Sequence, residues 1–177
     1  YYDTGLSVNL VYPHIVFDEM HFIDYFDHTK ILREYITDQE LYDKIIKRYE
    51  NRKNNEKLFF MGITMQNHGG YTETYDNFPE NYYKVGRSYT DANQYLSLVH
   101  ESDEAVKNLI SYFSKVDDPV EIIYVGDHQP SLNSNFYPIL NGKGLTGLTE
   151  DELEKLYTVP FFIWTNYDTP EETVDIT

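Results

Sequence analysis

Three short runs of the chain are almost entirely apolar or aromatic and end at polar residues. They occupy residues 58–65, 120–125 and 160–166. β-Branched and aromatic residues without regular polar alternation are typical of strands that are buried on both faces. The second run ends at Gly126, Asp127 and His128, and the first ends shortly before His68. The pattern therefore predicts polar side chains at the carboxyl ends of two buried strands.

Two places in the chain have the sequence pattern of a helix start. Thr37 and Glu40 match a reciprocal capping box, in which Thr caps the helix and Glu reaches back. Apolar residues then recur at helical spacing and predict a helix over about 38–51. Thr149 and Glu152 form a second capping box, which predicts a short helix ending near Tyr157.

The longest predicted helix runs from Thr90 to about Ser114. Its apolar residues recur at three-, four- and seven-residue steps and define one side of the helix: Tyr95, Val99, Val106, Ile110 and Phe113. The order strand, loop, helix, strand over residues 58–125 is that of a βαβ unit with parallel strands. Carboxyl ends of parallel neighbours meet at one sheet edge, so we expect His68 to face Asp127 and His128. Residues 1–36 are expected to form loops with short elements.

Composition narrows the classes of function. The 177 residues suit one domain, and Lys+Arg 14 against Asp+Glu 30 gives a net charge of −16. Such a surface repels nucleic acid and anionic lipid and favours cations. There are no cysteines, which excludes disulfides and thiolate metal sites. An aromatic-rich, 41% hydrophobic composition indicates a packed core rather than disorder.

No apolar run approaches the roughly 20 residues of a membrane span, so we expect this chain itself to be soluble. The chain starts at Tyr1 without an initiator Met. We interpret this start as that of a part of a longer protein.

Asp127 and His128 have two interpretations. They are either a strand-end Asp capping the next turn beside a solvated His, or ligands of a divalent ion. Carboxylate oxygen and neutral imidazole suit Mn²⁺, Zn²⁺ or Mg²⁺. Two ligands do not complete a metal site, so this interpretation needs further ligands.

His68 also has two interpretations. It is either a loop histidine hydrogen-bonded to backbone, or a donor that faces a phosphate or sulfate group. The adjacent Gly69 and Gly70 allow a substrate to approach closely. The Tyr-, Asn- and Gly-rich segment 71–88 is a candidate binding loop.

Several motifs together resemble the sulfatase-like domain of lipoteichoic acid synthase and its phosphoglycerol transferase relatives. The strongest are Thr-Met-Gln-Asn-His-Gly-Gly at 64–70, Gly-Asp-His-Gln-Pro-Ser-Leu at 126–132 and Val-Pro-Phe-Phe-Ile-Trp at 159–164. Further matches occur at 11–13, 17–19, 36–40, 93–97 and 101–103. They follow the order of the family along nearly the whole chain.

The resemblance implies the alkaline phosphatase-like fold, an α/β fold with a mixed, mostly parallel sheet flanked by helices. Residues 1–177 would be the C-terminal part of one such domain. Asp127 and His128 would be metal ligands, with Mn²⁺ as the usual ion and Mg²⁺, Zn²⁺ or Ca²⁺ as alternatives. His68 would contact the substrate phosphate. The family's reaction uses a metal-activated Thr that forms a covalent phospho-enzyme.

Two departures from the family pattern limit what the resemblance implies. The nucleophilic Thr and a metal-binding Glu belong to the N-terminal half of the family domain, so this chain would lack a catalytic nucleophile and be inactive alone. Val8 stands where the synthases carry a substrate-binding Arg. The alternatives are a sulfate ester hydrolase and a non-catalytic cell-surface binding module.

The resemblance also implies a setting. The complete protein would act at the extracellular face of a bacterial cell membrane, held there by a preceding N-terminal region. Its substrate would be a phospholipid head group or a cell-wall polymer, with no role for nucleic acid. The chain alone is expected to self-associate through uncovered apolar faces.

Overall fold

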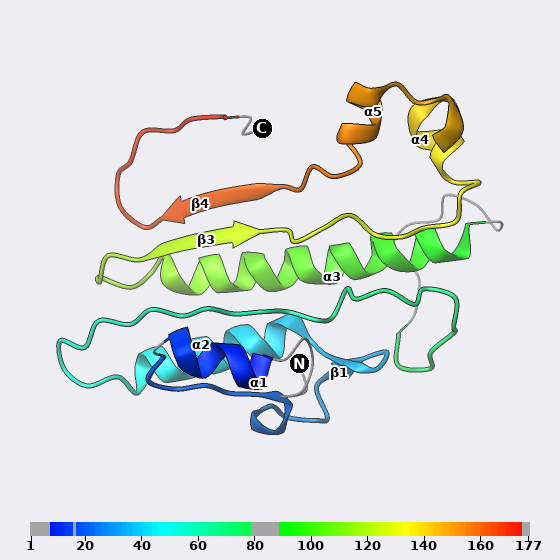
Figure 1. Cartoon of the computed structure of the whole chain (residues 1–177). Coiled ribbons are helices and arrows are strands. Elements are labelled where there is room, and N and C mark those ends of the chain that lie inside the picture. The colour runs from blue at the N-terminus through cyan, green and yellow to red at the C-terminus, as the bar shows by residue number, and fades with distance from the viewer. Residues whose placement is uncertain (1–7, 16, 79–88, 175–177) are drawn as a thin grey trace. The chain divides into compact units, whose positions relative to one another are not determined.

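The computed structural model of the chain describes residues 8–15, 17–78 and 89–174. It divides into two compact units, Tyr1–Leu109 and Ile110–Thr177, and the long helix α3 (Thr90–Phe113) crosses the boundary between them (Figure 1). His68 lies in the first unit, whereas Asp127 and His128 lie in the second. Each unit has its own set of elements.

The first unit contains helices and one short hairpin. Its elements before α3 are α1 (Val8–Val11), the 3-10 turns η2 (Tyr12–Ile15) and η3 (Ile23–Tyr25), β1 (Ile31–Leu32), β2 (Tyr35–Ile36) and α2 (Asp38–Glu50). β1 and β2 are antiparallel, with Ile31 opposite Ile36. The predicted helix at 38–51 is confirmed. Within residues 1–36, the described positions 8–15 and 17–36 form loops with short elements as expected.

Only half of the predicted capping box at α2 forms. Thr37 Oγ1 accepts a 3.1 Å hydrogen bond from the Glu40 amide, which is the expected cap. The Glu40 carboxylate does not reach back; its Oε1 accepts instead from the Asp27 amide at 3.0 Å. The Thr37 amide donates to the Lys30 carbonyl oxygen. Glu40 therefore ties the preceding loop to the start of α2.

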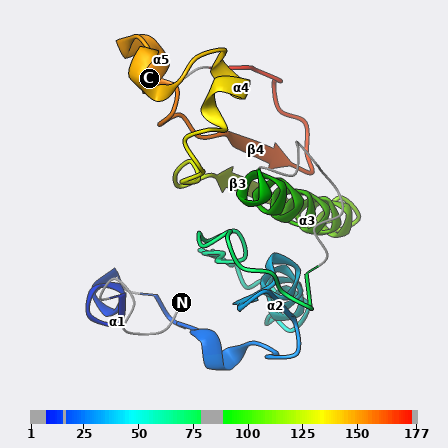
Figure 2. The same cartoon turned by 90° about the vertical axis from the view of Figure 1, so that its right-hand side faces the viewer.

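The predicted strand at 58–65 is extended but has no strand partner among the described residues. Both views show this segment running between α2 and α3 (Figures 1 and 2). The segment lies close to α2 at Gly62. A Cβ added there would lie 3.3 Å from the Leu41 side chain and 3.6 Å from that of Ile45. Phe59 is nevertheless 80% exposed. The segment thus has the backbone of a strand without its hydrogen-bond ladder.

The buried positions of α3 differ from the predicted apolar side. Val99 is exposed. Gln94, Ser97 and Leu98 are fully buried in the first half of the helix, and Ser102, near its middle, is also buried. Of the predicted apolar side, only Phe113 is fully within the buried set, whose apolar members are Ala92, Leu98, Ala105, Leu109 and Phe113. α3 therefore buries polar side chains along with apolar ones, and each of these polar groups needs a hydrogen-bond partner.

The second unit contains a two-stranded sheet and two short helices. Its elements are β3 (Glu121–Val125), α4 (Tyr137–Asn141), the 3-10 turn η4 (Leu145–Gly147), α5 (Glu150–Glu154) and β4 (Phe161–Thr165). The strands predicted at 120–125 and 160–166 are present as β3 and β4. Their predicted burial on both faces is wrong, because Ile123, Val125 and Ile163 are each about 60% exposed. The capping box of α5 is complete, although the helix ends before the predicted Tyr157.

β3 and β4 pair in antiparallel fashion, with Val125 opposite Phe161 and Glu121 opposite Thr165. The rings of Tyr124 and Phe162 stack across the pair at 5.2 Å. The two sheets in the described part of the chain are both antiparallel pairs. The elements are those of an α/β protein, but the mostly parallel sheet that the resemblance implied is not seen in these residues.

Asn166 fixes the end of β4 to the connection between α3 and β3. Its Nδ2 lies within hydrogen-bond distance of three carbonyl oxygens, and its Oδ1 accepts from the Val120 amide at 2.8 Å. The three acceptors are Phe113, Val116 and Asp118, at 3.3, 3.1 and 2.8 Å. One side chain thus satisfies the backbone where the helix ends and the strand begins.

Replacing Asn166 with alanine is expected to lower the free energy of unfolding by about 2–3 kcal/mol, because backbone groups lose their partners. Urea unfolding followed by circular dichroism measures this loss. Asn166→Asp is the matched variant, since it keeps the acceptor for Val120 and removes both donor hydrogens. Wild-type stability in Asn166→Asp would contradict a role for the donated bonds.

Within the described residues, no helix combines the length and apolar character needed to cross a bilayer.

Candidate functional site

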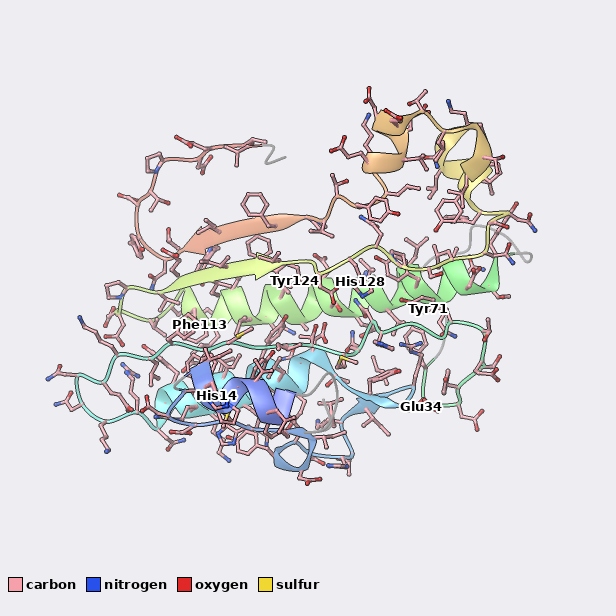
Figure 3. All side chains as sticks on the ribbon, in the orientation of Figure 1. His14, Glu34, Tyr71, Phe113, Tyr124 and His128 are labelled. Atoms are coloured by element: carbon pink, nitrogen blue, oxygen red, sulfur yellow. The ribbon has the colours of Figure 1, made fainter. Side chains whose placement is uncertain are left out.

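Asp127 and His128 lie directly beyond the carboxyl end of β3, and Figure 3 labels His128 just after the tip of that strand. Asp127 Oδ1 accepts a 2.8 Å hydrogen bond from the His128 amide. Its other oxygen, Oδ2, lies 3.5 Å from His128 Nε2. The side chains are 84% and 74% exposed, so both are open to a ligand.

The orientation of the His128 ring follows from its second nitrogen. Nδ1 lies 2.9 Å from the Gln129 carbonyl oxygen, which can only accept. A hydrogen bond to this oxygen uses the tautomer with the proton on Nδ1, and in that neutral tautomer Nε2 holds a free lone pair. Gln129 is itself anchored, because its side-chain nitrogen donates to the Thr158 carbonyl oxygen. The lone pair of Nε2 is held beside Asp127 Oδ2.

These two atoms fit the geometry of a shared divalent ion. Ligand atoms about 2.1 Å from one ion lie roughly 3–3.5 Å apart at tetrahedral or octahedral angles. The observed 3.5 Å between Oδ2 and Nε2 falls at the upper end of that range. The described residues contain no group of three or more potential His, Asp or Glu ligands. The pair thus supplies part of a coordination shell.

Gly126 brings the end of β3 close to the start of β4. The Gly126 amide donates to the Pro160 carbonyl oxygen at 2.9 Å. A Cβ at Gly126 would lie 3.3 Å from Val159 Cβ and 3.4 Å from Pro160 Cδ. A side chain at this position would push the strand ends apart, so Gly126 helps to fix where Asp127 begins.

The second candidate, His68, lies on a loop that closes with a tight turn. The His68 amide donates to the Met65 carbonyl oxygen at 3.0 Å. Gly70 has φ +94°, a conformation that side chains strongly disfavour, so glycine is required there. The His68 side chain is exposed, and its Nδ1 lies 3.1 Å from the Tyr35 hydroxyl oxygen. Nε2 has no hydrogen-bond partner among the described residues and is free to contact a substrate.

A buried polar network supports the base of this loop. Gln66 is 1% exposed; its Oε1 accepts from the Asp38 amide at 3.1 Å and its Nε2 donates to Ser102 Oγ at 3.1 Å. The Asn67 side chain donates to the same Ser102 oxygen at 2.9 Å. Ser102 Oγ in turn donates to Asp38 Oδ2 at 2.6 Å. The loop is thereby joined to the first turn of α2 and to α3.

Asp38 is the titratable group of this network. It is 2% exposed, and its Oδ1 has no hydrogen-bond partner in the described structure. Burial raises the pKa of Asp38 to about 6, although the hydrogen bond from Ser102 opposes the rise. The folded chain therefore binds this proton more tightly than the unfolded chain does.

This difference predicts a pH-dependent stability. The contribution of Asp38 is most favourable below about pH 4 and is lost as the pH rises to about 6, by up to about 3 kcal/mol. Asp38→Asn should remove this dependence, so the variant gains stability relative to wild type between pH 4.5 and pH 7. Urea unfolding at both pH values tests this. Asp43→Asn, at an exposed position of α2, is the control, and equal pH responses in all three proteins would contradict the prediction.

His68 and the pair Asp127 and His128 lie in different units of the chain. His68, Asp127 and His128 each lie beyond an apolar extended run, as the sequence predicted. That they share one edge stays a prediction. The outer part of the candidate binding loop, residues 79–88, and the Val8 side chain lie outside the described part of the structure.

The sequence did not single out Arg33 and Tyr35, which hold the His68 loop. Asp38 and Ser102, which also hold it, lie within the matches at 36–40 and 101–103, but no role was predicted for them. Ser97 and Ser102 lie near the predicted apolar side of the longest helix, and this position could have indicated that their side chains are buried. Small hydroxyl residues there are consistent with buried hydrogen bonds to a neighbouring segment. Arg33 and Tyr35 gave no comparable local signal.

The chain belongs to the sulfatase family, whose model matches residues 4–176. It is 32% identical over 124 residues to the "Capsular polysaccharide biosynthesis protein RkpI" of Rhizobium meliloti (strain 1021), covering 69% of this chain and 21% of that protein. It is 25% identical over 148 residues to a "Putative cyclic beta-1,2-glucan modification protein" of the same organism, covering 79% and 22%. The chain thus spans about a fifth of the length of these relatives. No solved structure matches it.

Proposed function

We propose that the chain contributes to a metal-dependent enzyme that transfers or hydrolyses phosphate esters of the cell envelope, in the manner of phosphoglycerol transferases. Asp127 and His128 act as metal ligands, and His68 contacts the phosphate. The observation that carries this proposal is the 3.5 Å pairing of Asp127 Oδ2 with the lone-pair nitrogen of His128 at a strand end. Family membership and the motif at 126–132 support it.

In this proposal Asp127 and His128 bind the metal, and His68 contacts the phosphate. Asp127 supplies a negative oxygen, and Gln129 holds His128 in the neutral tautomer that ligates. A bound divalent ion, Mn²⁺ or else Mg²⁺, Zn²⁺ or Ca²⁺, supplies Lewis-acid stabilisation of phosphate oxygens. His68 presents an exposed ring nitrogen to the same group. The nucleophilic Thr and the remaining ligands come from sequence outside this chain, so the chain alone is inactive.

The setting proposed is the extracellular face of a bacterial cell membrane, with attachment through a preceding region. A phospholipid head group or a cell-wall polymer is the substrate. The net charge of −16 supports a substrate other than nucleic acid. The names of the two relatives, which refer to a capsular polysaccharide and a β-glucan, support a glycan acceptor.

Self-association of the isolated chain is part of the proposal. Ile123, Val125 and Ile163 are each about 60% exposed, and Ile123 lies opposite Ile163 in the sheet. Water-exposed apolar side chains on paired strands favour contact between copies. Light scattering that shows a monomer at all concentrations would contradict it.

A sulfate ester hydrolase is the second candidate, because the matching family is the sulfatase family. Sulfate and phosphate esters present similar tetrahedral oxygens to His68 and to a metal. The third alternative, a non-catalytic cell-surface binding module, is favoured by Val8 in place of the Arg of the synthases.

One comparison separates the three functions. The longest natural protein that carries this chain is incubated with Mn²⁺ and either bis(p-nitrophenyl) phosphate or p-nitrophenyl sulfate, and p-nitrophenol release is measured. Preferential phosphodiester turnover supports the proposal. Preferential sulfate turnover supports the sulfatase, and turnover of neither substrate nor of a phosphatidylglycerol analogue supports the binding module.

A further inference from the structure

Arg33 occupies an unusual place in the first unit. It follows β1 and precedes β2 by two residues, and its φ of +55° lies in the left-handed region. A residue other than glycine or asparagine holds this conformation at a cost of about 1 kcal/mol or more. The side chain is 4% exposed, and no carboxylate lies within ion-pair distance of it in the described residues. A long charged side chain at such a turn needs a specific reason.

The guanidinium group of Arg33 binds the backbone of the His68 loop. Nη2 donates to the carbonyl oxygens of Gln66 and His68 at 2.9 and 2.6 Å. Nη1 donates to the Gly70 carbonyl oxygen at 3.3 Å. It also donates to Gln94 Oε1 at 3.2 Å. The guanidinium group therefore binds the carbonyl oxygens of every second residue of the loop, at positions 66, 68 and 70.

Tyr35 connects the same hairpin to the His68 ring. Its ring centre lies 5.3 Å from Arg33 Cζ, within the range of a cation–π contact. Its hydroxyl lies 3.1 Å from His68 Nδ1, and the two rings are 5.6 Å apart. A cation near the phenol ring withdraws electron density from the hydroxyl and makes it a better donor. The O–H group is then directed at the Nδ1 lone pair, which leaves the proton of the neutral imidazole on Nε2.

We propose that Arg33 and Tyr35 are positioning residues for His68. Arg33 fixes the backbone of residues 66–70, and Tyr35 selects the tautomer whose Nε2–H points outward. A neutral Nε2–H is a hydrogen-bond donor suited to a phosphate oxygen. This inference rests on the proposed contact between His68 and the phosphate.

Tyr35→Phe tests the tautomer. It removes one oxygen and keeps the ring, so the fold is retained. Nitrogen NMR of histidine-labelled protein, in the longest soluble form that carries the chain, reports the Nδ1 and Nε2 shifts of His68. The expected result is a shift of Nδ1 from the acceptor range toward a mixture of both tautomers. Tyr25→Phe is the matched control, because Tyr25 stacks on His21 at 3.9 Å and does not contact His68.

Arg33→Lys tests the loop. A lysine keeps the charge but cannot donate to three carbonyls in one plane. Amide exchange in residues 66–70 is expected to quicken about tenfold or more, as local opening becomes easier. Arg52→Lys is the control, since Arg52 stacks on Tyr49 at 3.9 Å and donates to the Tyr49 carbonyl oxygen. If Arg33→Lys does not fold, Tyr35→Phe still decides the tautomer.

Turnover of bis(p-nitrophenyl) phosphate separates this inference from the proposed function. Both variants should lower kcat more than they raise KM, because His68 acts on charge that develops in the transition state, and His68→Ala should lose activity. If His68→Ala is inactive while Tyr35→Phe and Arg33→Lys match wild type in NMR and in turnover, the positioning role is overturned. If the NMR changes occur but His68→Ala keeps full activity, the positioning stands and the phosphate contact fails.

Discussion

Replacing His68 with alanine is expected to reduce phosphodiester turnover in the complete protein about 100-fold or more, the usual cost of losing one donor to a developing negative charge. The exposed Nε2 of His68 is the group that contacts the phosphate in this proposal. Folding should be little affected, because the ring is exposed and the loop is held by its backbone. Initial rates at saturating Mn²⁺ measure the effect.

His21→Ala is the control for this experiment. His21 is also exposed, and it also stands beside a tyrosine, with ring centres 3.9 Å from those of Tyr25. Its loss should leave turnover unchanged. An equal loss in both variants would mean that the effect comes from general destabilisation, and full activity in His68→Ala would remove His68 from the site.

Replacing both Asp127 and His128 with alanine is expected to weaken Mn²⁺ binding by about 100-fold or more. Mutating residues that only hydrogen-bond to metal ligands already lowers metal affinity about 10–100-fold. The same double variant should lose metal-dependent turnover. Isothermal titration of the longest soluble form with Mn²⁺ measures the affinity directly. Mn²⁺ affinity should fall because the variant removes both Asp127 Oδ2 and His128 Nε2, which lie 3.5 Å apart at the end of β3.

The chain offers a closely matched control pair. Glu19 Oε2 lies 3.3 Å from His21 Nε2, and both side chains are exposed. Glu19→Ala with His21→Ala therefore removes a second carboxylate and imidazole at similar separation. Unchanged Mn²⁺ affinity in this control, with loss in the strand-end variant, is the expected outcome. Unchanged affinity in both would show that Asp127 and His128 are loop residues only.

Elements with a local cause were predictable from the sequence. The caps at Thr37 and Thr149 form because a hydroxyl three residues before a free amide needs no distant partner. β3 and β4 were recognisable because apolar and aromatic runs suit paired strands. The place of Asp127 and His128 directly after a strand was predictable for the same reason, since it depends only on where the strand ends.

Features that depend on distant partners were not predictable. The Glu40 carboxylate had a local partner in the capping pattern, yet it accepts from Asp27, which lies on a separate loop. The partner strand of residues 58–65 does not appear among the described residues, so a strand-like sequence has no ladder. A periodicity count also scores Gln94 and Ser102 as polar and places them outside, although their hydrogen bonds allow burial.

The support of His68 shows the same limit most clearly. Its loop was predicted from Gly69, Gly70 and the preceding apolar run. The guanidinium that holds the loop comes from a residue 35 positions earlier, at a turn whose backbone conformation favours glycine. No spacing rule connects these two places, because the contact depends on how the hairpin folds back.

The antiparallel pairing of β3 with β4 has a consequence for synthesis on the ribosome. The chain between the strands carries α4, η4 and α5, so Phe161 is added well after its partner Val125. At roughly 5–20 residues per second, β3 emerges about 2 to 7 seconds before its partner strand. During that interval Ile123 and Val125 lack β4, the partner strand that β3 has in the described residues. We expect chaperones that bind short apolar segments of nascent chains to engage β3, and slowing translation after Val125 to lower the yield of folded protein.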